Sequence, residues 1–495
     1  VLLRQSCWCF LFVGRERWKN GRRTLIVGAG DSAEHLAREL LRTDKADNLP
    51  VAFVDDDPMK QQMRFHRVPV MGTTDDIERI VKEQAIEEII LAMPSVPGEK
   101  RREIVAKCET AHLPIKTLPS IEEILSGKAS YADVRTVRPE DLLTREEIRL
   151  DTTSVSEYLE GKRILITGAA GSIGSELCRQ VSEFKPSELI LLDHNENKLY
   201  FLERELVEQG VHLRSLIGSI RDSVKMRKVF EEHRPHVVFH AAAHKHVPLV
   251  ERDPEEAVKN NILGTRILAE LCEPFGVERF VLISTDKAIN PTSVMGCSKR
   301  IAEMIVQHLG KQSQTRFCSV RFGNVLGSYG SVVPLFQRQI EKGGPVTVTH
   351  PEVRRYFMTI PEAVQLVLQT AAIGESGKVY MLNMGEQVKI DLLARDLITL
   401  HGLEPDKDIR IEYIGMRDGE KLHEELVGEN EKLIHTTFDH INVVEPENSP
   451  VDIVGSISEL ETLVSDSCSA ADVVAVMKRM VPTFAHFGSA IREGE

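Results

Sequence analysis

A glycine-rich turn between an apolar strand and a helix limits the folds that this chain can adopt. Residues 161–180 read GKRILITGAAGSIGSELCRQ, and the turn contains Gly168, Gly171, Ser172, Ile173 and Gly174. In a βαβ unit, glycines at this spacing let the backbone approach a pyrophosphate at the helix N-terminus, where the helix dipole and free N–H groups favour an anion. The segment therefore predicts a dinucleotide-binding α/β domain.

The next apolar segment, SELILLDHNENK, predicts a strand that ends at Asp193. A carboxylate at this position can bind a ribose 2′-hydroxyl and repel a 2′-phosphate. NAD is therefore favoured as the cofactor. His194 and Lys198, close behind, keep NADP as an alternative.

Four further strand segments alternate with helical segments up to residue 324. This alternation predicts a parallel sheet that binds ligands at the carboxyl edge of its strands. The candidate residues at those strand ends are Arg221 and Asp222, then Ala241, Ala242, Lys245 and His246, then Ser284 to Lys287, and finally Asn324.

An earlier segment, residues 23–57, also reads as strand, glycine turn, helix and strand. Gly28 and Gly30 form its turn, Ala33 takes the third small position, and Asp55 ends its second strand. Three more strand candidates complete a doubly wound domain over 23–120, expected to be a scaffold or regulatory domain rather than a second redox site. The predicted fold class is therefore α/β, with two Rossmann-like parallel-sheet domains.

The remaining boundaries follow from composition. Residues 121–160 are charged and irregular and are interpreted as a linker, and 161–495 as the catalytic domain with a smaller C-terminal α/β lobe for substrate. Residues 1–22 begin with an apolar run too short to span a bilayer, which is interpreted as a tail or the remnant of a membrane segment.

Overall charge and cysteine usage exclude several classes of protein. The net charge of −13 argues against a nucleic-acid partner. The eight cysteines are scattered, so neither a zinc framework nor a disulfide scaffold is indicated, and a reducing cytoplasm fits. His240, His244 and His246 lack matching carboxylates or cysteines, and no metal is predicted.

The segment STDKAINPTSVMGCSK, residues 284–299, places Met295 four residues before Lys299. Many nucleotide-sugar oxidoreductases have Tyr-x-x-x-Lys at this spacing, and a thioether cannot accept a proton from a sugar hydroxyl. The same segment offers Thr285, Asp286 and Lys287 instead. We interpret it as a site with a relocated base, in which Met295 fills the space of the tyrosine.

Six ordered motifs support a resemblance that runs over nearly the whole chain. They are TGAAGSIGSEL, HAAAHKHVPLVE, ISTDKAINPTSVMGCSKR, RFGNVLGSYGSVVPLF, THPEVRRYFMTIPEA and RDGEKLHEEL. The chain resembles the long, membrane-associated nucleotide-sugar dehydratases of bacterial polysaccharide biosynthesis, extended short-chain dehydrogenase/reductases typified by configuration-retaining UDP-N-acetylglucosamine 4,6-dehydratases. Four membrane helices, usual in that family, are missing from this sequence, and Asp418 replaces a usual proline.

The resemblance implies NAD-dependent removal of water from a UDP-N-acetyl-hexosamine, with Lys299 on the nicotinamide ribose. In this chemistry Thr285 relays the proton of the C4 hydroxyl, a protonated Asp286 is the acid for the C6 oxygen, and a neutral Lys287 of lowered pKa is the C5 base. An epimerase of the same fold and a non-catalytic nucleotide-sugar sensor are the alternatives.

Substrate recognition is expected to use several polar side chains. Guanidinium groups match phosphate geometry, which makes them candidates for the diphosphate. The candidates are Arg354, Arg355 and Arg417, together with Asn324, Glu420, Lys245 and His246. A homo-oligomer is expected, with helices around residues 301–309 at its interface. The expected location is the cytoplasm or, for a longer form, the cytoplasmic face of the inner membrane.

Overall fold

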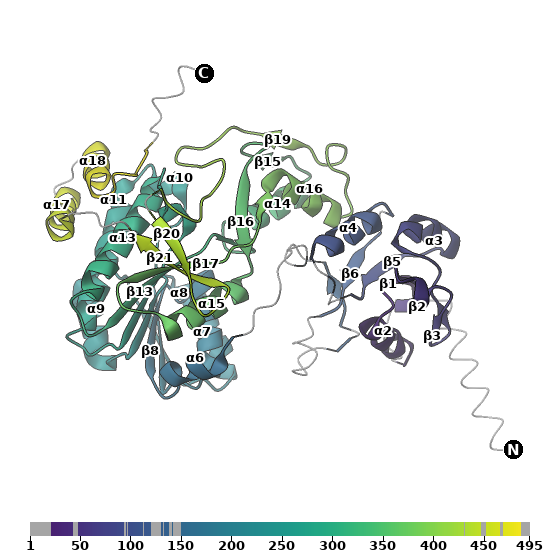
Figure 1. Ribbon diagram of the computed structural model, residues 1–495, viewed down its shortest axis with the longest axis horizontal. Helices are drawn as coiled ribbons and strands as arrows, with labels where there is room; N and C mark the ends of the chain where they lie inside the picture. The colour runs from purple at the N-terminus through teal and green to yellow at the C-terminus, as the bar shows by residue number, and fades with distance from the viewer. Residues whose placement is uncertain are drawn as a thin grey trace. The chain divides into compact units, whose positions relative to one another are not determined.

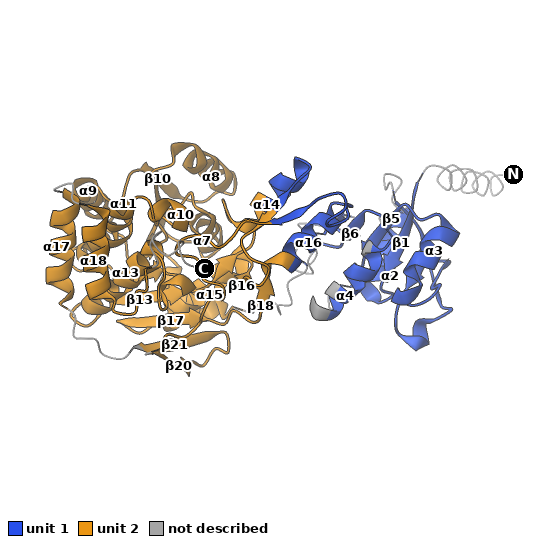
Figure 2. Cartoon of the chain, turned by 90° about the horizontal axis from the view of Figure 1, so that it is seen from above, with its two compact units in different colours: residues 1–146, 336–346, 392–412 blue, residues 147–335, 347–391, 413–495 orange. Residues whose placement is uncertain are grey.

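The chain folds into two compact units in the computed structural model (Figure 2). The first comprises residues 1–146, 336–346 and 392–412, and the second comprises 147–335, 347–391 and 413–495. The structure describes residues 21–42, 48–93, 96, 98–111, 113–119, 130–131, 133–137, 141, 150–429, 431–446, 452–465 and 469–486. The apolar run at the start of the chain lies outside the described residues.

The first unit is built on a five-stranded sheet (Figure 1). Side by side, its strands are β2 (Asn48–Val54), β1 (Arg22–Val27), β5 (Glu88–Leu91), β6 (Ile115–Thr117) and β7 (Arg135–Thr136). Its helices are α2 (Asp31–Arg42), α3 (Ile77–Gln84) and α4 (Gly98–Glu109), with the short turns η1 (Pro58–Lys60) and η2 (Thr74–Asp76). The first four strands are parallel. Such strands are apolar on both faces because helices cover both sides of the sheet.

One strand predicted for this first sheet is irregular. The segment VPVMG contributes β4 (Val68–Pro69), which pairs with β3 (Arg64–Phe65) in an antiparallel ribbon. The residues that follow β4 run parallel to β2, with a bridge between Phe53 and Val70, a hydrogen bond from the N–H of Met71 to the carbonyl oxygen of Phe53, and one from the N–H of Asp55 to that of Gly72. A run of two or three apolar residues does not reveal its pairing partner, so the sequence alone could not place it.

The second unit contains a nine-stranded sheet (Figure 1). In spatial order its strands are β10 (Leu213–Ile217), β9 (Glu188–Asp193), β8 (Arg163–Thr167), β11 (Val237–His240), β12 (Arg279–Ile283), β13 (Arg316–Arg321), β17 (Lys378–Leu382), β21 (Ile441–Pro446) and β20 (Glu431–His435). The first seven are parallel, as predicted for six of them, and β21 and β20 extend the sheet in antiparallel pairing. The predicted α/β fold class is confirmed.

Helices cover both faces of this sheet. Side chains of α6 (Thr152–Leu159), α7 (Ser172–Glu183), α8 (Glu196–Glu208) and α15 (Ile360–Ile373) contribute to one buried cluster. Those of α9 (Ser223–His233), α12 (Gly264–Cys272) and α13 (Val294–Gly310) contribute to a second cluster. Between these helices lie the short helices α10 (Val247–Val250) and α11 (Pro254–Ala257), the π-helix η4 (Val258–Leu263) and the turn η5 (Asp286–Ala288).

Part of the segment interpreted as a linker belongs to these cores. Strand β7 joins the first sheet, and α6 buries Val155, Tyr158 and Leu159 in the second unit. Both elements are short, two and eight residues. Over such lengths hydrophobic periodicity is too weak to detect, which is why the region appeared irregular.

Smaller elements follow the sixth parallel strand. Strands β14 (Asn324–Val325), β16 (Arg354–Met358) and β18 (Gln387–Lys389) form one sheet, and β15 (Val346–Val348) and β19 (Ile411–Tyr413) form another. Their helices are α14 (Val332–Glu341) and α16 (Ile390–Leu400). Among these elements, residues 336–346 and 392–412 belong to the first unit, and the small α/β lobe expected within 161–495 stays a prediction.

The last two helices, α17 (Ile453–Ser465) and α18 (Ala470–Met480), lie beside α13 and α11 (Figure 1). Ile301 and Ile305, expected at a subunit interface, are buried in a cluster with Leu460 and Met477 of this hairpin. Arg266 on α12 also forms an ion pair with Glu461, with 2.6 Å between nitrogen and oxygen. The face of α13 predicted to meet a second subunit is therefore covered by the chain itself.

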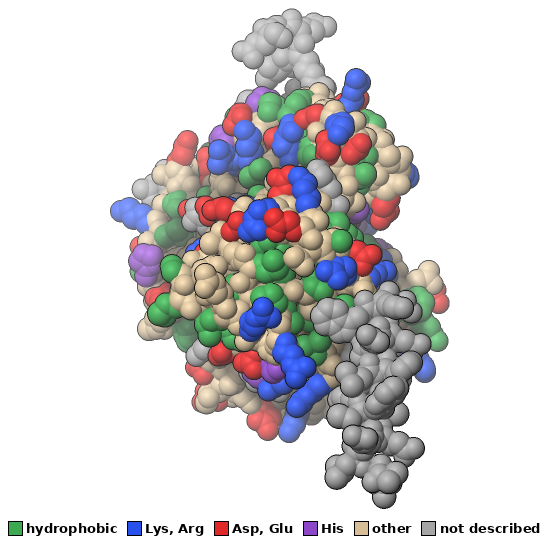
Figure 3. Space-filling model, turned by 90° about the vertical axis from the view of Figure 1, so that its right-hand side faces the viewer, with side chains coloured by type: hydrophobic (Ala, Val, Ile, Leu, Met, Phe, Trp, Pro, Cys, Tyr) green, Lys and Arg blue, Asp and Glu red, His purple; other side chains and the backbone are tan. Residues whose placement is uncertain are grey.

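Two surface properties bear on possible partners. Acidic and basic side chains are interspersed on the face shown in Figure 3. Among the described residues, no helix has the length and apolar character needed to cross a membrane.

Candidate active site

The glycine turn has the close packing that a dinucleotide-binding loop requires. Gly168 has φ of +69°, and a Cβ built there would lie 2.6 Å from the backbone nitrogen of Ala242. A Cβ on Gly174 would collide with the carbonyl oxygen of Gly168. Side chains at either position would push the turn away from β11 and α7. The backbone N–H groups at the start of α7 are thereby left accessible to a phosphate.

Asp193, at the end of β9, is buried to 7% exposure next to this turn. Its Oδ2 accepts a hydrogen bond from the N–H of Ala170 at 2.9 Å, and its Oδ1 accepts one from the N–H of Asn195 at 2.8 Å. The carboxylate is thus fixed between the glycine turn and the strand end, the place where an adenosine ribose lies in this kind of fold.

A cleft of about 780 Å³ begins at this turn and runs along the carboxyl edge of the sheet. The predicted residues on its wall are Gly168, Ser172, Ile173, Gly174, Asp193, Ala241, Ala242, Lys245, His246, Thr285, Lys287, Met295, Lys299 and Asn324. Pockets for drug-sized ligands typically have volumes of about 300–1,000 Å³. The glycine turn, the ribose carboxylate and the volume together fit a dinucleotide and leave wall residues for a second ligand.

Two predicted cofactor ligands do not line this cleft. Arg221 forms an ion pair with Glu256 at 2.6 Å, and Asp222 accepts a hydrogen bond from the N–H of Lys225 as the N-cap of α9. Neither residue lines the cleft, and their contact with the cofactor stays a prediction. They follow a strand end in sequence, but helix capping is a competing use for an aspartate at that position.

The predicted arginine clamp also lies off the wall. Arg354 and Arg417 are exposed, while Arg355 is buried to 7% exposure and forms an ion pair with Glu420 at 2.9 Å. The described cations that do line the cleft include Lys245. Burial and the neighbouring charge of Lys198 lower the pKa of Lys245.

The polar side chains of the segment after β12 are connected by hydrogen bonds, and we call them the polar chain. Thr285 Oγ1 donates a hydrogen bond to Asp286 Oδ1 at 3.0 Å, and Lys287 Nζ donates to the same oxygen at 3.0 Å. Lys287 Nζ also lies 3.4 Å from Oδ1 of Asn324. Thr285 and Lys287 line the cleft, whereas Asp286 is fully buried behind them. Asp286 therefore contacts the cleft through its two neighbours.

Protonation in this chain of groups agrees only partly with the sequence-based expectation. Burial, opposed by the charge of Lys287, raises the pKa of Asp286, and nearby Glu424 raises it further, which is the direction that the predicted acid requires. Burial alone would lower the pKa of Lys287, but Asp286 and Glu424 outweigh burial and raise it. The pKa of Lys287 is therefore raised in the protein without ligands, and the lowering expected from Lys299 and bound oxidised nicotinamide stays a prediction.

Glu424 is a buried acidic residue next to Lys287 that the sequence analysis did not single out. Its side chain is 3% exposed, and its Oε1 lies 3.3 Å from Lys287 Nζ and 3.7 Å from Arg355 Nε. The residue belongs to the motif RDGEKLHEEL, but four acidic side chains occur there and sequence alone does not show which one turns inward.

Helix α13 brings Met295 and Lys299 to the same wall of the cleft. Met295 is 4% exposed and Lys299 is 5% exposed. Burial lowers the pKa of Lys299 to about 8, with Glu303 one turn later opposing the shift. Lys299 therefore remains mostly protonated at pH 7, as a donor to ribose hydroxyls requires.

A second buried ion pair supports this part of the site. Glu303 accepts from Arg321 through both of its oxygens, at 2.8 and 2.7 Å, and from the hydroxyl of Ser284 at 2.6 Å. Glu431 on β20 also accepts from Arg321. Because Ser284 directly precedes Thr285, this network fixes the strand end that presents the polar chain.

The histidines of the fourth strand end are structural or line the cleft. Burial lowers the pKa of His240 to about 3, and its ring nitrogens bond to Thr167 at 2.7 Å and Thr265 at 3.0 Å. His244 and His246 lie on the wall of the cleft. In the described part of the chain, no three metal-binding side chains are grouped so that they could hold a metal ion.

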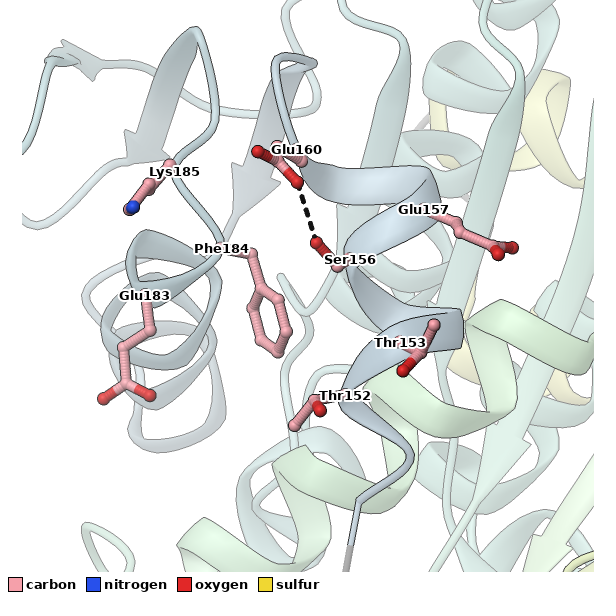
Figure 4. A pocket seen from close by; sticks show the side chains of 8 residues that line it. All are labelled: Thr152, Thr153, Ser156, Glu157, Glu160, Glu183, Phe184 and Lys185. Carbon is pink, nitrogen blue, oxygen red and sulfur yellow. Dashed lines mark hydrogen bonds between the residues drawn. The ribbon is translucent and has the colours of Figure 1, made fainter.

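A second hollow, of about 570 Å³, lies between α6 and the C-terminal end of α7 (Figure 4). Its lining includes Glu157, Glu183 and Phe184, and Ser156 donates to Glu160 at 3.0 Å. This end of α7 is opposite the glycine turn, and none of the predicted site residues is part of the hollow. We therefore assign the candidate active site to the cleft at the carboxyl edge.

Replacing Asp193 tests the cofactor site. Asp193→Ala is expected to weaken NAD⁺ binding about tenfold or more, because hydrogen bonds to charged groups contribute about 1.5–3 kcal/mol. Discrimination against NADP⁺ should relax as well, since a carboxylate repels the 2′-phosphate. Titration calorimetry with both cofactors measures the two effects. Asp222→Ala, which removes an aspartate off the cleft, is the matched control, and an unchanged preference in Asp193→Ala would contradict the assignment.

Comparisons with known proteins identify the family of this chain. The sequence model of the family described as polysaccharide biosynthesis protein matches residues 164–446, and a model described as a CoA-binding domain matches residues 1–119. The chain is similar to the probable polysaccharide biosynthesis protein EpsC of Bacillus subtilis, with 48% identity over 424 residues, or 85% of this chain and 71% of that protein.

Two further matches have lower sequence identity to this chain. A UDP-N-acetylglucosamine 4,6-dehydratase (inverting) of Campylobacter jejuni is 33% identical over 301 residues, covering 59% of this chain and 85% of that enzyme. The X-ray structure of Pen from Bacillus thuringiensis has a TM-score of 0.55 and 30% identity, covering 62% of this chain and 98% of that one. The chain therefore belongs to the polysaccharide biosynthesis protein family, as a nucleotide-sugar enzyme with the short-chain dehydrogenase/reductase fold.

Proposed function

We propose that the chain catalyses the NAD-dependent 4,6-dehydration of a UDP-N-acetyl-hexosamine to a 4-keto-6-deoxy sugar for a surface polysaccharide. The proposed substrate is UDP-N-acetylglucosamine. The observation that carries the proposal is the chain of polar groups on the cleft wall. Thr285 and Lys287 face the cleft, and Asp286 joins them at 3.0 Å on each side. A dehydration needs several proton-transfer groups within reach of one sugar.

Each residue has a distinct task in this proposal. Bound NAD⁺ supplies hydride acceptance from C4 and hydride return to C6. Thr285 accepts the proton of the C4 hydroxyl while it passes its own proton to the Asp286 carboxylate. Lys287, once neutral, removes the proton from C5 and returns it there when C6 receives the hydride. Asp286 supplies the proton that leaves with the C6 oxygen, and does so through its neighbours because it is buried. Lys299 orients the nicotinamide ribose from the next helix.

Met295 supports a relocated base rather than an inactive site. It lies at the wall position where a tyrosine would act, and it is 4% exposed. A thioether accepts no proton at neutral pH. The hydroxyl of Thr285 takes over this role in the proposal, because its hydrogen bond to Asp286 gives the proton a further path.

The UDP-sugar substrate is proposed from the relatives and from the second half of the cleft. The Campylobacter relative is named for UDP-N-acetylglucosamine. Lys245 and His246 on the wall are suited to the diphosphate, because cations and ring N–H groups bind phosphate oxygens. The configuration of the product at C5 separates a retaining from an inverting dehydratase and is read by NMR spectroscopy.

Incubation with UDP-N-acetylglucosamine and NAD⁺, followed by mass spectrometry, tests the proposal. Loss of one water from the substrate is the expected result. Unchanged mass with an altered sugar configuration would instead identify an epimerase. Ligand-dependent stabilisation against heat, without any turnover, would identify a nucleotide-sugar sensor.

A further inference from the structure

A short segment, residues 417–425, contacts the polar groups of residues 285–287 although it is distant from them in the sequence. We call it the closing segment. It is tied down by hydrogen bonds from the N–H of Arg354 to the carbonyl oxygen of Leu422 and from Gln387 Nε2 to that of Glu424. The hydroxyl of Thr292 donates to the carbonyl oxygen of Gly419. The closing segment therefore holds Glu424 in a fixed place.

The Glu424 carboxylate is turned inward and shared between two cations. Its Oε1 lies 3.3 Å from Lys287 Nζ and 3.7 Å from Arg355 Nε, while its Oε2 is buried without a hydrogen-bond partner among the described residues. Arg355 has a second acidic partner, Glu420, at 2.9 Å. Lys287 also has a second acidic partner, Asp286 at 3.0 Å, but its nitrogen lies nearer to Glu424 than that of Arg355 does.

The ammonium group of Lys287 has mostly acidic neighbours. Asp286 from η5 and Glu424 from the closing segment lie 3.0 and 3.3 Å from its ammonium, and Asn324 from β14 presents an amide oxygen at 3.4 Å. Arg355 from β16 is the opposing charge. Burial would raise the pKa of Glu424, but Lys287, Arg355 and Lys421 outweigh burial and lower it. An ionised Glu424 beside a cationic Lys287 is thus the favoured state.

This arrangement conflicts with the task that the proposed function gives to Lys287. A base at C5 needs an unprotonated amine, yet two carboxylates hold the ammonium form. We propose that Glu424 is a positioning residue that keeps Lys287 protonated in the ligand-free enzyme, so that the base becomes available only when bound substrate weakens this ion pair. The inference deepens the proposed dehydration and rests on Lys287 being its base.

The proposal predicts a change in the amine reactivity of Lys287. Only the unprotonated amine reacts with acetic anhydride, and an opposite charge at this distance shifts a pKa by about one to three units. Glu424→Gln should therefore increase labelling of Lys287 about tenfold or more at any pH below its pKa. Trace labelling between pH 7 and 10, with peptide mass spectrometry and the exposed Lys311 as internal reference, measures this without turnover.

Two variants separate charge from packing. Glu424→Asp retains the carboxylate and should label almost as slowly as the wild type. Glu425→Gln removes an exposed carboxylate from the adjacent position and should leave Lys287 unchanged. Equal increases in Glu424→Gln and Glu424→Asp would show that packing is the cause, and no increase in Glu424→Gln would show that Glu424 does not control the charge. Either result overturns the proposal.

The pH dependence of the reaction provides a second test of the role of Glu424. The acidic limb of C5 proton exchange with solvent should move to lower pH by about one to three units in Glu424→Gln. A purely structural defect would lower the rate without moving this limb. If the wild type releases no water from the substrate, the proposed function fails, while the labelling still decides the role of Glu424.

Discussion

Lys287→Met is expected to abolish water loss and C5 solvent exchange while NAD⁺ binding remains. General-base assistance contributes about 10²–10⁴-fold, and methionine retains much of the side-chain volume without the amine. The cofactor site is formed by the glycine turn and Asp193, which do not contact Lys287 in this structure. Deuterium incorporation at C5, product mass and NAD⁺ affinity are the three measurements.

A lysine far from the cleft provides the control for this change. Lys311, just after α13, is exposed, so Lys311→Met should behave like the wild type. Near-normal turnover in Lys287→Met would remove Lys287 from the mechanism. Simultaneous loss of NAD⁺ binding would show instead that the substitution disturbs the whole cleft.

Thr285→Val and Met295→Ala should differ strongly in hydride transfer. Valine retains the branched shape of threonine but cannot relay a proton to Asp286, so transient NADH formation should fall by about 10²–10⁴-fold. Met295→Ala should destabilise the protein by about 2–5 kcal/mol, because its side chain is almost fully buried, with a modest effect on the rate of folded enzyme.

Single-turnover absorbance of NADH, together with chemical denaturation, compares the two variants. The denaturation curves identify any loss of folded protein, so that rates are compared for native enzyme alone. A fully active Thr285→Val combined with an inactive but well-folded Met295→Ala would contradict the relocated base.

The elements of the catalytic sheet could be predicted because each carries its own local signal. Buried parallel strands read as short apolar runs, such as β8 and β9, and a glycine turn with left-handed φ marks the start of α7. Thr285, Lys287, Met295 and Lys299 follow from two adjacent elements, β12 and α13. Neighbouring strand ends meet at one edge of a parallel sheet, so these residues could be placed together without a structure.

The substrate side was predicted less well because charged residues have several uses that sequence does not distinguish. Arg355, expected on a diphosphate, is held by Glu420 and Glu424 from a segment about 65 residues later in the chain. Asp222 caps a helix, and Ile301 is buried by the C-terminal hairpin rather than by a second subunit. Each of these outcomes depends on a partner that is remote in sequence.

The sequence by itself determined the α/β class, the glycine turn and the place of Asp193 and residues 284–299 at the carboxyl edge of the sheet, since these depend on local spacing and on strand ends that a parallel sheet brings together. Only the tertiary structure decided the charge of the site. A residue's pKa depends on burial and on charges within a few ångströms. Glu424 and Lys287 are 137 positions apart in sequence, yet they lie 3.3 Å apart in the fold.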